Sequence, residues 1–180
     1  MSEESPKFNL HPVSGPGQRE VMQALTYLVV DDDNFSRILL KKFIQRFADS
    51  NVLEAEGSGH ALDLLRTQKV DVMITDLRMP DMDGDGLVWC LRRSDDERLR
   101  RIPVVMISAH DDADDRASSR DAGVDEFAVK PCAPEDFQRL VRQAVLEPRT
   151  YIATADFVGP DRRRKNSNSF AGPDRRRKPN

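Results

Sequence analysis

The side chains best suited to chemistry in this sequence follow short apolar runs. Asp76 comes after the run Val72-Met-Ile74, and a loop containing Asp83-Gly84 follows it. The other candidates stand behind three more apolar runs and are Asp31, Asp32, Ser108 and Lys130. In an open α/β sheet, ligands bind and reactions occur beyond the carboxyl ends of the strands. Asp76 is therefore the predicted reactive group, and the other side chains are its predicted neighbours.

This set of side chains suits the transfer of a phosphoryl group. Three carboxylates close together need a counter-charge, and a hard divalent cation with oxygen ligands, Mg²⁺, can supply it. Asp76 can attack phosphorus as a nucleophile, while Lys130 and the metal neutralise charge on the phosphoryl oxygens and Ser108 donates from its hydroxyl. Taken singly, the Asp31-Asp-Asp33 run could be a solvated helix cap and Lys130 a surface lysine. Their joint placement behind separate strands favours the site.

Alternating apolar segments predict the elements that bring these residues together. Strands are expected at residues 26–30, 52–55, 72–74, 103–107 and 124–129, with a helix after each, and a charged loop at 94–101. Asn34, Gly123 and Pro134 are suitable helix-end residues at an N-cap, a C-cap and a first turn. We therefore predict an α/β fold, a doubly wound (βα)5 flavodoxin-like parallel sheet of order 2-1-3-4-5.

Composition limits the classes of protein that the chain can belong to. No apolar run approaches the roughly 18 residues of a membrane helix, and the polar N-terminus lacks the apolar core of a secretory signal. Cys90 and Cys132 show no metal-ligand spacing and are predicted to be reduced thiols, and the three histidines are too dispersed for a zinc site. We expect a cytoplasmic protein without membrane insertion.

Charge divides the chain into two parts. Residues 151–180 contain eight Lys and Arg against three Asp and carry +5, whereas the first 150 residues carry -8. Pro, Gly and polar residues dominate both ends of the chain. We predict a flexible arm at 1–20, one domain at 21–147 and a disordered arginine-rich tail at 148–180. A basic tail beside an acidic body suggests two activities, although the tail could also fold back on the body.

Four motifs, in order along the chain, resemble the two-component response-regulator receiver domains of the CheY type. They are Leu28-Val-Val-Asp-Asp32, Asp76-Leu-Arg-Met-Pro80 with Met82-Asp-Gly84, Ile107-Ser-Ala109 and Val129-Lys-Pro131. The resemblance covers roughly residues 25–146. It implies that Asp76 is the phospho-acceptor, charged by a histidine kinase or a histidine phosphotransfer protein. It also implies Mg²⁺ ligation by Asp31, Asp32 and Asp76, with the main-chain carbonyl of Arg78.

The same resemblance implies that phosphorylation switches a protein-interaction face. It also implies that the protein is not an enzyme that turns over a small substrate. Ser108 would follow the phosphoryl group, and Phe127 would turn inward and reshape the face made by the fourth helix, fifth strand and fifth helix. Simple core packing is the alternative for Phe127. The only reactions implied are phosphorylation and dephosphorylation of the aspartate itself. Arg78 and His110 occupy positions that vary freely in the family, and we expect them to alter the lifetime of the acyl phosphate.

The tail contains a repeat. Phe157-Val-Gly-Pro-Asp-Arg-Arg-Arg-Lys165 recurs thirteen residues later as Phe170-Ala-Gly-Pro-Asp-Arg-Arg-Arg-Lys178, with eight of nine positions identical. Charge alone would not require the non-basic residues to recur in register. Arginine can pair with guanine and bind phosphate, aspartate can accept from guanine N–H groups, and phenylalanine can stack on a base. The predicted nucleotide-binding residues are Asp161, Arg162, Arg163, Arg164, Asp174, Arg175, Arg176 and Arg177.

A small two-fold guanine dianion such as cyclic di-GMP fits this repeated unit. The arrangement resembles the Cle-type CheY-like regulators, whose arginine-rich extensions bind cyclic di-GMP and which act at the flagellar motor. It implies an output protein connected with motility or surface behaviour. Three alternatives stay open for the tail: a solubilising segment, an inert appendage of a phosphorelay shuttle, and a nucleic-acid-binding element, which would show steep salt dependence.

Overall fold

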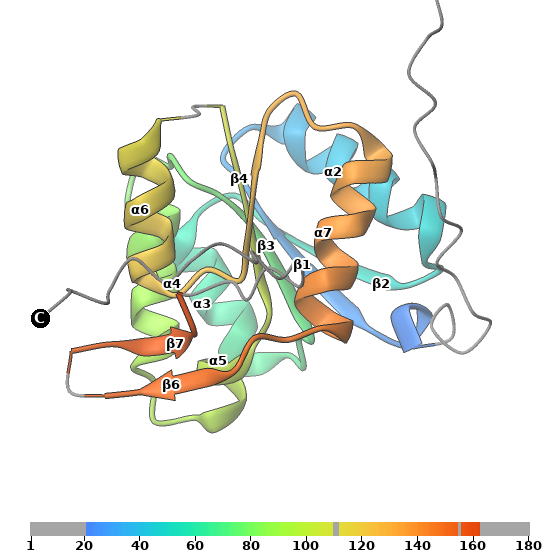
Figure 1. Cartoon of the computed structure of the whole chain (residues 1–180). Helices are drawn as coiled ribbons and strands as arrows, with labels where there is room; N and C mark the ends of the chain where they lie inside the picture. Colours follow the sequence, from blue (N-terminus) through green and yellow to red (C-terminus); the bar gives the residue numbers. More distant parts are fainter. Residues whose placement is uncertain (1–20, 110–111, 155, 163–180) are drawn as a thin grey trace, which may run out of the picture.

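Five parallel strands form the centre of the molecule in the computed structural model, which describes residues 21–109, 112–154 and 156–162. The strands are β1 (Thr26–Val30), β2 (Asn51–Ala55), β3 (Val72–Asp76), β4 (Val104–Ser108) and β5 (Glu126–Val129). Their order is β2-β1-β3-β4-β5, as Figure 1 shows. The predicted doubly wound fold and its strand order are confirmed. The predicted arm, residues 1–20, lies outside the described residues.

Helices cover both faces of this sheet. They are α2 (Asn34–Phe47), α3 (Ser58–Thr67), α4 (Gly84–Arg92), α5 (Glu97–Arg101), α6 (Ala113–Ala122) and α7 (Pro134–Leu146). Helices α2 and α7 pack together on one face, and α3, α4 and α6 lie on the other (Figure 1). The Asp33 side chain caps α2 by accepting from the Ser36 amide, one residue before the predicted cap. Gly123 ends α6 and Pro134 begins α7, as predicted.

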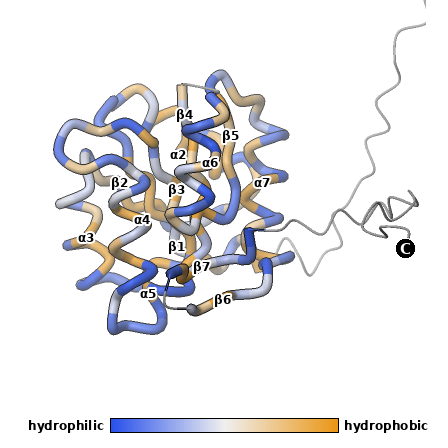
Figure 2. Tube along the Cα trace, turned by 60° about the vertical axis from the view of Figure 1, so that its left-hand side comes forward, coloured by the Kyte–Doolittle hydropathy of each residue, from blue (hydrophilic) through white to orange (hydrophobic). Residues whose placement is uncertain are grey.

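The strands are apolar at nearly every position because each supplies two cores. Leu28 and Val30 of β1 belong to the core under α3 and α4, whereas Tyr27 and Val29 belong to the core under α2 and α7. Side chains of a strand alternate between its faces, so a sheet covered on both sides needs continuous apolar runs. Figure 2 shows hydrophobic residues along the central strands and hydrophilic ones in the loops. The two cores thereby determine where each strand ends.

Residues 94–101, predicted to be a charged loop, contain the short helix α5. The Asp96 side chain caps this helix by accepting from the amide of Arg98 at 2.8 Å, and Leu99 is buried in the core. The prediction of a loop was wrong because the many charged residues outweighed the one apolar residue, Leu99, which anchors this short helix in the core.

The first part of the predicted tail also differs from expectation. Strands β6 (Tyr151–Ala153) and β7 (Val158–Pro160) form an antiparallel hairpin that lies beside α5, at the lower edge of Figure 1. The ring of Phe157 is only 5% exposed, and the Tyr151 hydroxyl donates to the Arg100 carbonyl at 3.0 Å. Two aromatic anchors therefore order a segment whose composition suggested disorder. Residues 163–180 lie outside the described residues.

A buried arginine joins the elements at the amino ends of β4 and β5. The Arg92 side chain is 1% exposed and pairs with the Asp125 carboxylate at 2.9 Å. Its other donors reach the carbonyl oxygens of Gly123, Arg100 and Ile102 at 2.8–2.9 Å. Burial lowers the pKa of Arg92, but the Asp125 charge opposes this shift. Each donor has a partner, so the ion pair can be tolerated in the interior.

Replacing this arginine should destabilise the whole domain. We expect Arg92→Met to lower the free energy of unfolding by about 3–5 kcal/mol, because the buried Asp125 carboxylate loses its counter-charge. Denaturant unfolding monitored by circular dichroism measures this change. Arg66→Met is the matched control, because Arg66 is exposed and forms a surface ion pair with Asp63. Equal unfolding midpoints for the two variants would contradict the role assigned to Arg92.

Candidate functional site

Four of the predicted site residues meet at the carboxyl edge of the sheet. Asp76 is the last residue of β3, Ser108 is the last residue of β4, and both are buried. Asp31 follows β1 and is 1% exposed, and Lys130 follows β5. The Lys130 ammonium lies 2.6 Å from Asp76 Oδ1 and 2.8 Å from Asp31 Oδ2. The predicted convergence of groups from separate strands is therefore confirmed.

The pKa values of Asp76 and Lys130 reflect opposite balances of burial and charge. Burial raises the pKa of Asp76, and its hydrogen bond with Lys130 only partly offsets that effect. Burial lowers the pKa of Lys130, but its hydrogen bonds to Asp31 and Asp76, together with their charges, outweigh burial and raise the pKa. Lys130 is therefore a fixed positive charge beside Asp76, whose carboxylate lies in a partly desolvated position.

Backbone groups fix the orientation of both buried carboxylates. The Arg78 amide donates to Asp76 Oδ2 at 2.8 Å, and the Asp33 amide donates to Asp31 Oδ1 at 2.9 Å. Each carboxylate therefore uses one oxygen for a backbone amide and the other for Lys130.

Two supporting residues were not identified from the sequence. A Cβ atom on Gly84 would lie 2.2 Å from the Asp76 carbonyl oxygen, so only glycine fits where α4 begins beneath the site. Arg37 of α2 donates to the carbonyl oxygens of Asp31 and Asp32 at 2.8 and 3.3 Å. The sequence marked Gly84 as a loop residue and as part of the Met82-Asp-Gly84 motif, but it did not reveal this close approach. Nothing in the sequence pattern pointed to Arg37, whose role depends on how α2 packs.

The predicted magnesium ligands are only partly gathered. Asp32 is exposed, and no cluster of three or more acidic, histidine or cysteine side chains occurs among the residues that the structure describes. Asp31 and Asp76 nevertheless both lie within 2.8 Å of one ammonium group, so their spacing already lets them share a cation. Hard carboxylate oxygens of this kind fit Mg²⁺, with the exposed Asp32 at the rim of the site.

Arg78 makes a contact that the sequence did not reveal. Its guanidinium pairs with the Asp115 carboxylate in the first turn of α6 at 2.5 Å, while 60% of the Arg78 side chain stays exposed. The loop after Asp76 is thereby tied to α6. His110, the second residue expected to act on the acyl phosphate, lies outside the described residues.

Phe127, the predicted switch residue, is half-buried. Its ring packs against the core under α3 and α4, and the Arg116 guanidinium covers it at 5.0 Å from the centroid. The position combines core packing with partial access to the surface. Its movement on phosphorylation therefore stays a prediction.

Two of the predicted nucleotide-binding residues are described, and both have contacts within the domain. The Asp161 amide donates to the Thr150 carbonyl at 2.7 Å, which closes the hairpin. Arg162 pairs with Asp121 of α6 at 2.7 Å and covers the ring of Phe157 at 4.2 Å. Because Phe157 is buried beneath Arg162, the expectation that its ring stacks on a base is not met in this arrangement. The other six residues of the predicted set lie outside the described residues.

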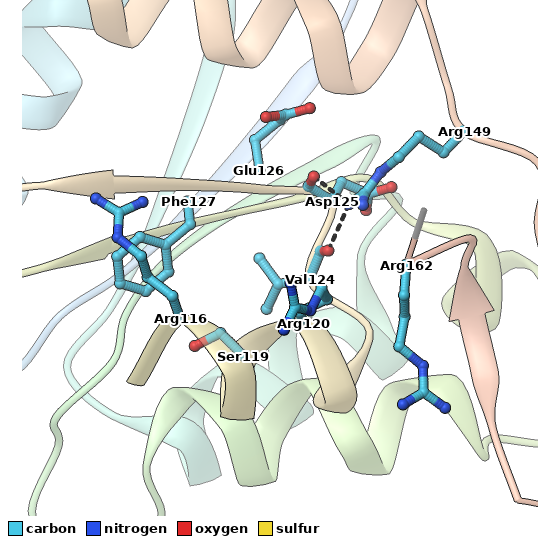
Figure 3. Close-up of a pocket in the computed structure, with 9 residues that line it drawn as sticks. All are labelled: Arg116, Ser119, Arg120, Val124, Asp125, Glu126, Phe127, Arg149 and Arg162. Atoms are coloured by element: carbon cyan, nitrogen blue, oxygen red, sulfur yellow. Dashed lines mark hydrogen bonds between the residues drawn. The ribbon is translucent and has the colours of Figure 1, made fainter. Parts of the chain in front are cut away.

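A groove rich in arginine lies between α6, β5 and the residues that flank the hairpin. It has a volume of about 260 Å³, and Arg116, Arg120, Arg149 and Arg162 line it together with Phe127 and Glu126. Figure 3 shows Arg116 lying against Phe127 and Arg149 reaching the backbone carbonyls of Val124 and Asp125. The groove lies on the same face as the predicted switch residue.

Comparisons with known proteins agree with this geometry. The family model described as "Response regulator receiver domain" matches residues 27–142. The chemotaxis protein CheY of Pseudomonas aeruginosa is 35% identical over 104 residues, which are 58% of this chain and 82% of that protein. The response regulator MprA of Mycolicibacterium vanbaalenii is 33% identical over 123 residues, covering 68% of this chain but only 50% of that protein.

Solved structures give the same result. The crystal structure of a response regulator receiver protein from Pseudomonas putida is 30% identical and superposes with a TM-score of 0.60. The match covers 67% of this chain and 97% of that structure. The arginine-rich repeat lies beyond the residues that the family model matches.

Removing the Arg78 side chain should change the lifetime of an acyl phosphate on Asp76. We expect Arg78→Ala to alter the dephosphorylation rate several-fold, because it removes a cation two residues from the acceptor and frees α6 from the loop. Loss of phosphate from purified protein, followed by Phos-tag electrophoresis, gives the rate. Asp115→Asn should also alter it by releasing Arg78, whereas the distant Arg66→Ala should not. An unchanged rate in Arg78→Ala would reject this role.

Proposed function

Because the chain belongs to the response regulator receiver domain family, we propose that Asp76 accepts a phosphoryl group from a histidine kinase or a histidine phosphotransfer protein. The observation that carries this proposal is the buried Asp76 carboxylate held against Lys130 and the Arg78 amide. The two contacts orient the carboxylate, and both favour its anionic form against the opposing effect of burial. The protein then acts as a cytoplasmic signalling switch and turns over no other substrate.

The described residues support a simple sequence of events. A carboxylate oxygen of Asp76 attacks phosphorus, the phosphorus–nitrogen bond of the donor histidine breaks, and the electron pair leaves with the imidazole. Lys130 then pairs with the phosphoryl oxygens in place of the carboxylate, and Ser108 approaches them from the end of β4. Receiver domains generally bind Mg²⁺ at this site, where Asp31, Asp32, Asp76 and the Arg78 carbonyl would hold it against the phosphoryl charge.

The surface beside the site suits a protein donor. Phe35 is 72% exposed, and Ile38 and Leu39 are about 40% exposed, all on α2 directly after Asp31 to Asp33. Exposed apolar residues grouped beside a reactive site are typical of a protein contact surface. A phosphohistidine on a partner helix can approach Asp76 over this part of α2.

The output surface in this proposal is the face of α6, β5 and α7. The Arg78–Asp115 ion pair joins the phosphorylation loop to α6, and Arg116 of α6 covers Phe127 of β5. A new negative charge at Asp76 competes with Asp115 for Arg78 and draws Ser108 toward the phosphoryl group. Both effects act on α6 and β5. They therefore support a change in the α6–β5–α7 face on phosphorylation.

Phosphorylation by a small-molecule donor tests the proposed function directly. We expect acetyl phosphate with Mg²⁺ to add one phosphoryl group to the wild-type protein and none to Asp76→Asn, as measured by intact-mass spectrometry. Asp81→Asn is the control, because Asp81 is an exposed carboxylate in the same loop. Removal of Mg²⁺ with EDTA should also prevent the reaction. Equal phosphorylation of Asp76→Asn would overturn the assignment of the acceptor.

A second proposed activity is binding of cyclic di-GMP by the arginine-rich part of the chain. The arginine groove supports it, because four arginines line one cavity and the Arg149 Nε atom is buried without a hydrogen-bond partner among the described residues. Phosphate oxygens are suitable acceptors for such donors. The ligand would then lie beside Phe127 and could influence the same output face, with a motility protein as the expected partner.

Isothermal titration calorimetry at physiological salt tests this second activity. We expect saturable micromolar binding of cyclic di-GMP, little binding of GTP, and loss of binding when Arg162–Arg164 and Arg175–Arg177 are all changed to alanine. Arg66→Ala is a control for charge removal elsewhere. Equal weak binding of both nucleotides, or affinity that depends steeply on salt without base preference, would instead favour a polyanion-binding tail. No binding would favour a phosphorelay shuttle with an inert tail.

A further inference from the structure

The first tail repeat is docked on the domain through residues that the second repeat also contains. Phe157 is buried, Pro160 is buried, and Arg162 pairs with Asp121. Each of these three residues recurs thirteen positions later, as Phe170, Pro173 and Arg175. The non-basic residues of the repeat are therefore explained by docking on the domain, without a ligand.

Glycine is required within the docked segment. Gly159 has a φ of 155°, and a Cβ atom there would lie 3.0 Å from the Cα of Gly123. Two backbones thus approach each other closely where β7 crosses the end of α6. The second repeat keeps this glycine, as Gly172. A repeat that served only to carry positive charge would not need it.

The hairpin turn is also compatible with the second repeat. The Thr154 hydroxyl lies 3.1 Å from the Phe157 amide and 3.2 Å from its carbonyl oxygen. Ser167 stands three residues before Phe170, as Thr154 stands three residues before Phe157. The one difference within the nine-residue repeat is Val158 to Ala171, at a position that is only half-buried. The residues of the docked strand itself, from Phe157 to Arg162, therefore recur in the second repeat with one conservative change, while the short turn at Thr154 would be replaced by a longer loop.

We propose that Phe170–Lys178 is a second ligand for the same docking surface and replaces the first repeat there within one molecule. The surface consists of Gly123, the Asp121 carboxylate and the edge of β6, which remains in place. Only one repeat can occupy it, so the other is always free for an external partner. A partner that captures one repeat then leaves the docking surface covered by the other.

The length of the connecting loop determines which repeat occupies the docking surface more often. Four residues, 154–157, join β6 to the first docking strand, whereas seventeen residues, 154–170, would join it to the second. The second loop is about four times as long as the first, which is two doublings of length. Each doubling lowers the equilibrium constant for closing the loop about threefold. The first repeat is therefore favoured roughly eightfold. A second molecule is a weaker competitor, because a tethered segment has an effective concentration near millimolar.

Hydrogen exchange of the peptide containing β6 tests the exchange of repeats, because either repeat protects that strand. The experiment compares the exchange rate of this peptide, followed by mass spectrometry, in four full-length proteins: wild type, Phe157→Ala, Phe170→Ala and the double variant. Phe157→Ala should reduce protection by about tenfold at most, Phe170→Ala should leave it unchanged, and the double variant should exchange as an unstructured peptide. The β3 peptide is the internal control for an intact domain.

The remaining outcomes would overturn the proposal. If Phe157→Ala alone exchanges as fast as the double variant, the second repeat does not dock. If the double variant stays protected, the phenylalanines are not the anchors. If protection in Phe157→Ala falls on dilution of the protein, the occupant comes from another molecule and docking within one chain is rejected.

Discussion

The ammonium group of Lys130 connects the ends of three strands, and the site depends on it. Asp31 and Asp76 follow or end neighbouring strands, and their carboxylates would repel each other without a cation between them. Lys130 reaches both from β5, across the end of β4. A single positive charge thereby holds two buried carboxylates together. In the proposed function, a phosphoryl group on Asp76 would pair with this lysine, so the contact that stabilises the resting site would also respond to phosphorylation.

A similar arrangement occurs at the opposite end of the sheet. Arg92 pairs with Asp125 in front of β5 and bonds to three backbone carbonyls. The two cations differ in access to water, because 29% of the Lys130 side chain is exposed but only 1% of the Arg92 side chain. A buried guanidinium with hydrogen bonds on each of its nitrogens holds the segments around it in one arrangement. A half-buried ammonium can exchange one partner for another.

The hairpin extends the buried arginine network to the surface. Arg149 bonds to the carbonyls of Val124 and Asp125, which adjoin the Arg92 pair, and also to the carbonyl of Asp161. The chain that follows the receiver domain is therefore attached to the amino end of β5, while Lys130 stands at its carboxyl end. Phe127 lies between the two on the same strand, beside the arginine groove. Signals from the site and from the tail would thus meet at β5 and α6.

The sequence by itself determined the fold, the order of the strands and the residues at their carboxyl ends. Continuous apolar runs indicate strands that are buried on both faces of a sheet. A polar residue directly after such a run therefore lies at the carboxyl end of a strand. It did not determine which contacts those residues make. The Arg78–Asp115 pair, the close approach at Gly84 and the burial of Phe157 each join segments that are distant or differently patterned in the chain. Only the tertiary structure decides such contacts, because they depend on the distance between packed elements and not on the local periodicity that a sequence reveals.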